Sequence, residues 1–308
     1  MAHRLGASTA AVWAALGAIY VIWGATYLGM EIAIESIPPF LMASIRFFIA
    51  GAILYALFRP RSTRPTLRHW IATAIVGTFL LVGGNALVAV AQTRIDTGVA
   101  ALIVATFPLW IATFDFAANG RRLRPLSVVG VLVGFAGIAL LIRPGGDIDL
   151  VGALICLFAP ISWTIGSLYA RGARLPDNLL LGSGMEMLAG GALLAVVGFA
   201  SGERLDVGAV SGRSWLALAA LILFGSIVAY SCYVWLLTVA PTELVSTYAY
   251  VNPVIAVLLG AVFLEEAITA WVLLAGAAIV TSVVLIVRAQ SAPPAQPVVE
   301  EDAATLAA

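Results

Sequence analysis

Long apolar stretches, separated by short polar links, most restrict the folds open to this sequence. About 20 apolar residues in a helix cross roughly 30 Å of hydrocarbon. Only 10% of the residues are charged, against about 25% in soluble domains. The sequence therefore predicts an all-α integral membrane protein. Ten transmembrane helices are expected, at 13–33, 38–58, 70–91, 97–117, 126–142, 152–171, 179–200, 214–237, 243–264 and 270–288.

The arginines indicate the orientation in the membrane, because the chain has no lysine. Links rich in basic residues remain in the cytoplasm. If ten spans alternate, one side receives Arg4, Arg59, Arg61, Arg64, Arg68, Arg121, Arg122, Arg124, Arg171, Arg174 and Arg288. The other side receives only Arg94, Arg143, Arg204 and Arg213. Both termini are thus expected in the cytoplasm of a cell with a bacterial-type inner (plasma) membrane, and the link at Gly145 and Gly146 outside.

The two halves of the chain match each other at a nearly constant offset. The matches are Trp23 with Trp163 and Arg46 with Glu186, then, after a short insertion, Trp70 with Trp215, Thr97 with Thr242 and Pro108 with Pro253. Each half holds five spans, an odd number, so the two copies must enter the membrane from opposite sides. Secondary transporters use such inverted repeats around one central site. The expected units are residues 1–145 and 146–290, followed by a disordered cytoplasmic tail at 291–308.

Three segments carry a family resemblance: "WGATYLGMEIAIESIPPFLMASIRFFIAG", "TGVAALIVATFPLWIATF" and "STYAYVNPVIAVLLGAVFLEEAIT". They resemble the drug/metabolite transporter superfamily in its ten-helix EamA-type branch, and the likeness extends over residues 13–288. The resemblance implies a secondary transporter, since members export amino acids, other metabolites or toxic compounds. Relatives commonly carry a basic residue where this chain has Glu31.

Charged residues inside the expected spans are candidates for functional groups. Such residues are rare in membranes unless they face the protein interior or water and find a partner. Counted from the short link "ESIPPF", Glu31 and Arg46 lie at matching depth and are expected to pair. Arg171 and Glu186 occupy the corresponding positions of the second half with the signs exchanged. The pairs can be structural, or they can line a cavity and gate its mouths.

Polar and aromatic residues at mid-membrane depth complete the expected site, although packing alone also explains aromatic residues there. The expected substrate-binding or cavity residues are Trp23, Tyr27, Arg46, Asn85, Trp163, Glu186, Tyr230, Tyr248 and Asn252. The expected gating or helix-breaking residues are Glu31, Pro108, Arg171 and Pro253. Each proline removes a helical hydrogen bond and frees the carbonyl four residues earlier.

Several enzyme signatures are absent from the sequence. It contains no nucleotide-binding G-x-x-x-x-G-K-[ST] motif and neither H-E-x-x-H nor G-x-S-x-G. Its two cysteines form no C-x-x-C, so no metal, cofactor or catalytic residue is expected. The favoured function is export of small molecules across the bilayer by alternating access, without nucleic-acid partners. A membrane scaffold or sensor and, last, a membrane-embedded enzyme are the alternatives. The oligomeric state stays open.

Overall fold

The computed structural model describes residues 8–119, 124–142 and 148–291. Every regular element among them is helical. The elements are α1 (Thr9–Ile34), α2 (Pro39–Phe58), η1 (Arg59–Arg61), α3 (Leu67–Gly77), η2 (Thr78–Ala86), α4 (Leu87–Gln92), α5 (Thr97–Val104), α6 (Phe107–Asn119), α7 (Pro125–Leu141), α8 (Leu150–Gly172), α9 (Leu179–Ala200), α10 (Gly212–Ala220), η3 (Leu221–Val228), α11 (Ala229–Val239), α12 (Thr242–Val245), α13 (Tyr248–Phe263) and α14 (Ala270–Ser291).

Eight helical segments of the described chain are long and apolar enough to cross a membrane. Three of them join consecutive elements: α3, η2 and α4; α5 and α6; and α10, η3 and α11. Two further apolar helices, α7 and α13, are shorter. Helices thus occupy all ten ranges in which spans are expected. The expected tail and the link at Gly145 and Gly146 lie outside the described residues.

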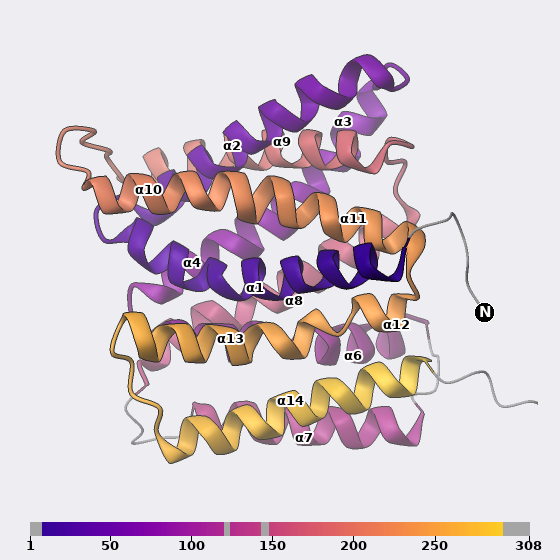
Figure 1. Cartoon of the computed structure of the whole chain (residues 1–308), viewed down its shortest axis with the longest axis vertical. Helices are drawn as coiled ribbons and strands as arrows, with labels where there is room; N and C mark the ends of the chain where they lie inside the picture. Colours follow the sequence, from indigo (N-terminus) through magenta and orange to yellow (C-terminus); the bar gives the residue numbers. More distant parts are fainter. Residues whose placement is uncertain (1–7, 120–123, 143–147, 292–308) are drawn as a thin grey trace, which may run out of the picture.

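The helices lie side by side and run across the view of Figure 1. Helix α1 begins, and α14 finishes, at the same end of the bundle, which we call the terminal end (Figure 1, right). Helix α2 packs chiefly on α9, α7 on α14, and α1 on α13 and α11. Although α1 and α2 are consecutive, they contact each other little. Sequence neighbours are therefore not the main packing partners here.

The α2–α9 contact is close because glycines line it. A Cβ on Gly51 would lie 2.6 Å from the backbone nitrogen of Leu188, and one on Gly191 would lie 2.7 Å from that of Phe48. Small residues allow helix backbones in membranes to approach in this way. The contact holds the middle of α2, which carries Arg46, against the middle of α9, which carries Glu186.

The end opposite the terminal end is sealed by apolar packing. All eight residues of α5 are buried there. Around α5 lie Met30 and Ala33 of α1, Ala91 of α4 and Leu218 of α10, in one buried cluster. Small and aliphatic side chains fill most of this part of the bundle, and the polar side chains of Gln92 and Thr97 are buried within it.

Two carboxylates from the second half cap helices of the first half at the sealed end. Glu203 accepts the backbone N–H groups of Phe40 (3.1 Å) and Leu41 (2.9 Å) at the start of α2. Glu266 accepts those of Thr97 (2.7 Å) and Gly98 (3.0 Å) at the start of α5. The first N–H groups of a helix have no partner within the helix, and negative charge is favourable beside them. These bonds therefore tie the halves together.

Two π-helical segments, η2 and η3, interrupt the third and eighth expected spans. Their i to i+5 bonding leaves an irregular ladder of carbonyl groups, and such segments are frequent at functional sites. Side chains from facing helices bind these carbonyls. Trp23 Nε1 of α1 donates to Gly225 O in η3 (3.2 Å), and Ser162 Oγ of α8 donates to Phe79 O in η2 (2.8 Å).

Candidate functional site

A cavity of about 330 Å³ lies between the two halves of the bundle. Its size is at the lower end of the range for small-molecule sites, roughly 300–1,000 Å³. Most of its wall is apolar or aromatic, and among the lining residues only Arg46 and Glu186 carry charged side-chain types. The lining residues are Trp23, Thr26, Tyr27, Met30, Arg46, Phe47, Leu80, Leu81, Asn85, Val88, Ala101, Val104, Ala105, Phe107, Pro108, Trp163, Ser167, Glu186, Met187, Gly225, Ser226, Tyr230, Tyr233, Tyr248, Ala249, Asn252 and Pro253.

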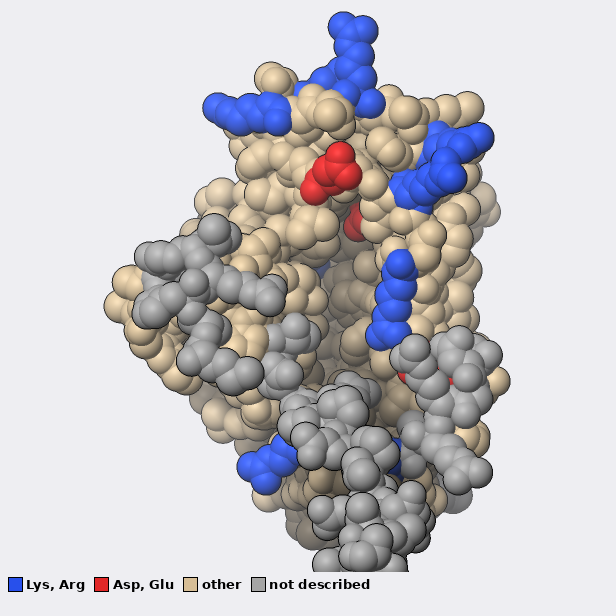
Figure 2. Space-filling view, turned by 90° about the vertical axis from the view of Figure 1, so that its right-hand side faces the viewer, with Lys and Arg blue, Asp and Glu red and all other residues tan. Residues whose placement is uncertain are grey.

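The cavity reaches toward the terminal end of the bundle. Figure 2 looks onto that end and shows a deep hollow between the helices, with basic side chains around it. The lining residues Ser167 and Tyr248 lie near that end, close to the end of α8 and the start of α13. Since apolar packing seals the opposite end, the cavity is accessible from one side of the bundle.

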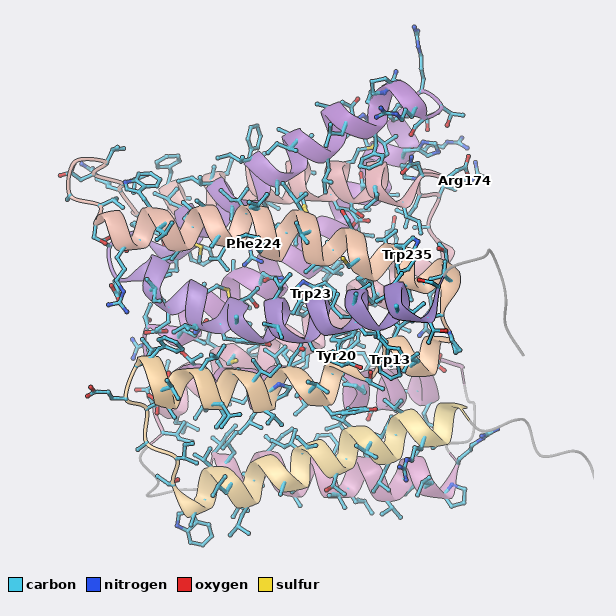
Figure 3. All side chains as sticks on the ribbon, in the orientation of Figure 1. Trp13, Tyr20, Trp23, Arg174, Phe224 and Trp235 are labelled. Atoms are coloured by element: carbon cyan, nitrogen blue, oxygen red, sulfur yellow. The ribbon has the colours of Figure 1, made fainter. Side chains whose placement is uncertain are left out.

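Four aromatic residues form one cluster in the cavity wall. The ring centroid of Trp23 lies 5.2 Å from that of Tyr233 and 5.1 Å from that of Tyr248. Tyr233 also packs edge-on against Tyr248 (5.8 Å) and lies 6.1 Å from Tyr230. Figure 3 shows Trp23 near the middle of α1. Across the cavity, Trp163 packs against Phe107 at 6.3 Å. Such walls favour flat, apolar parts of a ligand.

Arg46 is held at the cavity wall by Ser226 of η3 and by the adjacent residue, Phe47. Its Nε donates to Ser226 Oγ (2.9 Å), and its guanidinium carbon lies 4.8 Å from the ring centroid of Phe47. The side chain is buried, with 5% of its surface exposed. Its Nη1 has no hydrogen-bond partner in the described part of the chain. A buried guanidinium without a carboxylate is costly in a membrane and is retained mostly for function.

Glu186 supplies the acidic group of the cavity from α9. The structure describes no ion pair for it, and Tyr230 interacts with it electrostatically. Arg46 and Glu186 thus share one cavity without pairing. This arrangement leaves both groups available to a ligand.

Comparison with known proteins agrees with this architecture. The EamA-like transporter family matches residues 8–143 and 150–288, one match in each half. The chain belongs to the EamA-like transporter family. The inner membrane transporter YedA of Escherichia coli strain K12 is 40% identical over 293 residues, which cover 94% of each chain. These matches confirm the resemblance of the chain to the EamA-type branch of the drug/metabolite transporter superfamily.

Other members of the EamA-like family are more distant but match over most of the chain. The "Probable amino-acid metabolite efflux pump" of Escherichia coli K12 is 21% identical, covering 82% of this chain and 86% of its own. The transporter YvbV of Bacillus subtilis strain 168 is 25% identical, covering 88% and 90%. A solved crystal structure that is 26% identical aligns with a TM-score of 0.62 and covers 92% of this chain. By name, the first of these relatives is an efflux pump and the second is a transporter.

The predicted ion pair between Glu31 and Arg46 is wrong. Glu31 lies toward the sealed end, where its Oε2 accepts from Gln92 Nε2 (3.3 Å), while Arg46 binds Ser226. The depth count assumed that consecutive helices face each other. In fact α1 packs on α13 and α11, and α2 on α9, so residues of equal depth on α1 and α2 do not meet.

The corresponding pair between Arg171 and Glu186 is wrong for the same reason. Arg171 reaches Asp115 of α6, with its Nη1 3.9 Å from Oδ1, because α8 packs on α6 and not on α9. Neither Glu31 nor Arg171 lines the cavity. Their roles as gates stay predictions.

The structure brings all nine of the predicted cavity residues, and both prolines, to the cavity wall. Pro108 follows the break between α5 and α6, whereas Pro253 lies inside α13. Val104 and Ala249, whose carbonyls the prolines free, also line the cavity. The Asn252 amide, oriented with its nitrogen toward α1, donates to the carbonyl oxygens of Tyr20 and Tyr248 (3.2 Å each). What these residues do in transport stays a prediction.

The wall residues that the predicted site did not contain include Tyr233, Ser226 and Gly225. Tyr233 follows Tyr230 by three residues, and residues three apart share a helix face. That spacing could have identified Tyr233. Ser226 and Gly225 lie in η3, whose π-helical turn shifts the facing residues in a way that α-helical spacing does not give. In the described residues, no group of three or more His, Cys, Asp or Glu could hold a metal.

Proposed function

We propose that this chain is a secondary exporter of small metabolites, amino acids or drugs, built from two inverted five-helix repeats that cross the membrane ten times. The repeats, residues 1–145 and 146–290, rock around the cavity and open it to one side at a time. In the proposed orientation the terminal end is cytoplasmic, and the cavity is open inward. The observation that carries the proposal is the composition of the cavity wall.

Most wall residues come in pairs that the repeat offset relates, which supports a two-fold site. On α1, α2, α8 and α9 the offset is 140, and on the later spans it is 145. The pairs are Trp23 with Trp163, Tyr27 with Ser167, Arg46 with Glu186, Phe47 with Met187, Leu80 with Gly225, Leu81 with Ser226, Asn85 with Tyr230, Val88 with Tyr233, Val104 with Ala249, Phe107 with Asn252 and Pro108 with Pro253. A site between inverted repeats is expected to draw on equivalent positions of both.

The helix contacts support the same symmetry. Helix α1 packs on the segment α10, η3 and α11, and α8 packs on the equivalent segment of η2 and α4. Helix α1 also packs on α13, and α8 on α5 and α6. The two largest contacts, α2 with α9 and α7 with α14, each join equivalent helices. This is the pattern that a two-fold axis between the halves produces.

The two ends of the bundle are closed to different extents, although the two halves are related by symmetry. This difference supports alternating access. At the sealed end, α5 is wholly buried and its first N–H groups are capped by Glu266. At the terminal end, the equivalent stretch is only half-buried from Leu244 to Ala249, except for the buried Val245. A rocking mechanism requires that two equivalent parts of the protein adopt different states, one closed and one open. If the two parts exchanged their states, the cavity would open at the opposite end.

Arginine placement and relatives support the orientation and the direction. Most arginines of the described chain lie at or near the terminal end of the bundle, in agreement with a cytoplasmic position. One relative carries the name of an efflux pump. The other two are named as transporters, one of them in the inner membrane.

Transport by the purified protein in liposomes tests the proposal. Liposomes loaded with a panel of labelled amino acids, aromatic acids and cationic dyes would be assayed for protein-dependent release, with empty liposomes as the control. We expect release of at least one compound, and exchange between labelled and unlabelled forms of it. Binding without release or exchange for any compound would favour the scaffold or sensor reading instead.

A further inference from the structure

We propose that Arg46 binds the anionic group of the transported molecule, so that the cavity selects singly charged organic anions with an apolar or aromatic body. This inference rests on the proposed function, because it assigns the substrate class of the same cavity. Carboxylates are the simplest groups of this kind, and guanidinium groups bind them strongly.

The hydrogen bonds of Arg46 give the first argument for an anion site. One donor, Nε, is used by Ser226 Oγ, and Phe47 supports the plane of the guanidinium. The nitrogen Nη2 lies beside Gly225, since a Cβ there would be 3.1 Å from it. Nη1 is left without a partner in the described chain. A fixed plane with an unused donor is positioned to donate a hydrogen bond to an external oxygen, and unpaired buried donors are rare in folded proteins.

The lack of a carboxylate paired with Arg46 in the described chain gives the second argument. No carboxylate forms an ion pair with Arg46 in the part of the chain that the structure describes, and the predicted partner, Glu31, is bound to Gln92 instead. A lone buried cation in a low-dielectric site attracts an anion strongly. A ligand anion would therefore supply the paired negative charge that the described protein does not.

The remaining wall limits the charge and the shape of the ligand. Arg46 is the only basic side chain lining the cavity, and Glu186 lines it as well. A doubly charged phosphate would meet one cation and one acid, so a single negative charge fits better. Trp23, Tyr233 and Tyr248 present ring faces and edges to the same space. These rings suit an aromatic or aliphatic body.

Three probes with one skeleton test the charge selection: 3-phenylpropionate, its neutral amide 3-phenylpropanamide, and the cation 3-phenylpropylamine. Binding to the purified full-length protein would be followed by quenching of tryptophan fluorescence. We expect the carboxylate to bind roughly 10- to 100-fold more tightly than the amide, the amount that a charged hydrogen bond contributes. Equal binding of acid and amide, tighter binding of the amine, or no binding of the acid would overturn the inference.

Arg46→Gln should abolish the preference for the acid over the amide, and Arg46→Lys should keep part of it. The control is Arg213→Gln, the same substitution at an exposed arginine that pairs with Glu35. Misfolding of Arg46→Gln would weaken all three probes together, whereas the inference predicts loss of the ratio alone. If the variant does not fold, Arg46→Lys decides, since an unchanged or absent preference in it rejects the role of the guanidinium.

The same variants separate this inference from the proposed function. If the liposome assay finds a cationic substrate that Arg46→Gln still releases at the normal rate, the anion site is wrong and the exporter stands. If no compound is released while the acid binds as expected, the exporter is wrong and the anion site stands.

Discussion

Gly225 lets two cavity residues approach the same stretch of backbone. Trp23 donates to its carbonyl, and Arg46 lies against its Cα side. A Cβ at this position would lie 3.1 Å from both Arg46 Nη2 and Thr26 Cγ2. A contact that tight forces a neighbour to move by a few tenths of an ångström. The residue that equivalence places here in the first half is Leu80, so only the second half has this gap.

Gly225→Ala is therefore expected to lower transport severalfold without unfolding the protein. Alanine favours helix by about 1 kcal/mol over glycine, so thermal stability should be unchanged or slightly higher. Transport rate and melting temperature would be measured together. Gly17→Ala is the control, because nothing lies within 4 Å of its Cβ position. Normal transport by Gly225→Ala would show that the guanidinium tolerates the displacement.

Trp23→Ala and Trp163→Ala are each expected to reduce transport at least tenfold while the protein still reaches the membrane. Trp23 bridges the aromatic cluster and η3, and Trp163 packs on Phe107 and beside Gly84. Trp235→Ala is the matched control, since that ring is 36% exposed and lies outside the cavity wall. Efflux from cells and the amount of protein in membranes would be measured. Full efflux in both variants would mean that the two rings only pack.

Sequence reasoning identified residues that the structure brings to one cavity wall, but not their partners. Depth needs only the rise per residue and the ends of a span, which hydropathy locates well. For this reason Trp23 and Trp163 could be assigned to mid-membrane depth. A partner also depends on which helices touch and on their rotation. Glu31 was assigned to Arg46 because both are equally deep, yet its helix faces elsewhere.

At the scale of helices, the cap on α5 is expected to hold the sealed end closed. Glu266→Gln removes the charge but keeps one acceptor for the N–H groups of Thr97 and Gly98. We expect the free energy of opening this turn to fall by about 1 kcal/mol, which corresponds to roughly fivefold faster amide exchange. Hydrogen exchange of peptides covering residues 95–104 would measure it.

Glu265→Gln is the control for that exchange experiment. Glu265 is the adjacent acid, exposed, with a positive φ of 58°, and the structure describes no hydrogen bond to its side chain. Its substitution should leave exchange at the start of α5 unchanged. Equal effects of the two variants would point to general loss of negative charge at this end rather than to the cap.

The pKa of Asp96 gives this end a pH dependence. Partial desolvation of its carboxyl, and then the charge of Glu266, raise the pKa of Asp96 above its ordinary value of 3.8. A raised pKa favours the protonated acid in the folded protein. The protonated carboxyl of Asp96 therefore favours the closed state of the sealed end at low pH. This contribution is lost as the pH rises through the raised pKa. Exchange at Thr97 and Gly98, corrected for intrinsic rates, should increase over that interval. Asp96→Asn should flatten the curve, and an unchanged curve would remove Asp96 as the cause.

At the scale of the whole molecule, the two ends of the bundle are expected to face different compartments. Thr63→Cys lies in a link at the terminal end and Ala209→Cys in a link at the sealed end, both exposed. In a background without Cys156 and Cys232, a membrane-impermeant maleimide added to intact cells should label position 209 and not position 63. The reverse result would invert the proposed orientation, and labelling of both only after cell lysis would contradict exposure of either end.

The architecture was more accessible to sequence reasoning than its details. Apolar length located helices in all ten expected ranges, and the match of Trp23 with Trp163 indicated the repeat. The π-helical turns were not foreseen, because Thr78–Ala86 and Leu221–Val228 have ordinary apolar compositions. Their irregular bonding depends on donors from other helices, Ser162 and Trp23, which only the folded chain brings near.

The π-helical segments also make the cavity sensitive to chain length in a way that point substitutions do not reveal. Each residue advances an α-helix by about 100°, so the wider turn of η2 sets the direction in which Asn85 points relative to the start of α3. Removing one residue from η2 would let the segment wind as an ordinary α-helix. The residues on either side of η2 would keep their directions, because a π-helical turn holds about one residue more than an α-helical turn, but the wall at η2 itself would change. In this chain a single deletion within Thr78–Ala86 should thus leave a membrane-inserted protein whose cavity is altered only at η2, where Leu80, Leu81 and Asn85 line it and Ser162 binds the carbonyl of Phe79.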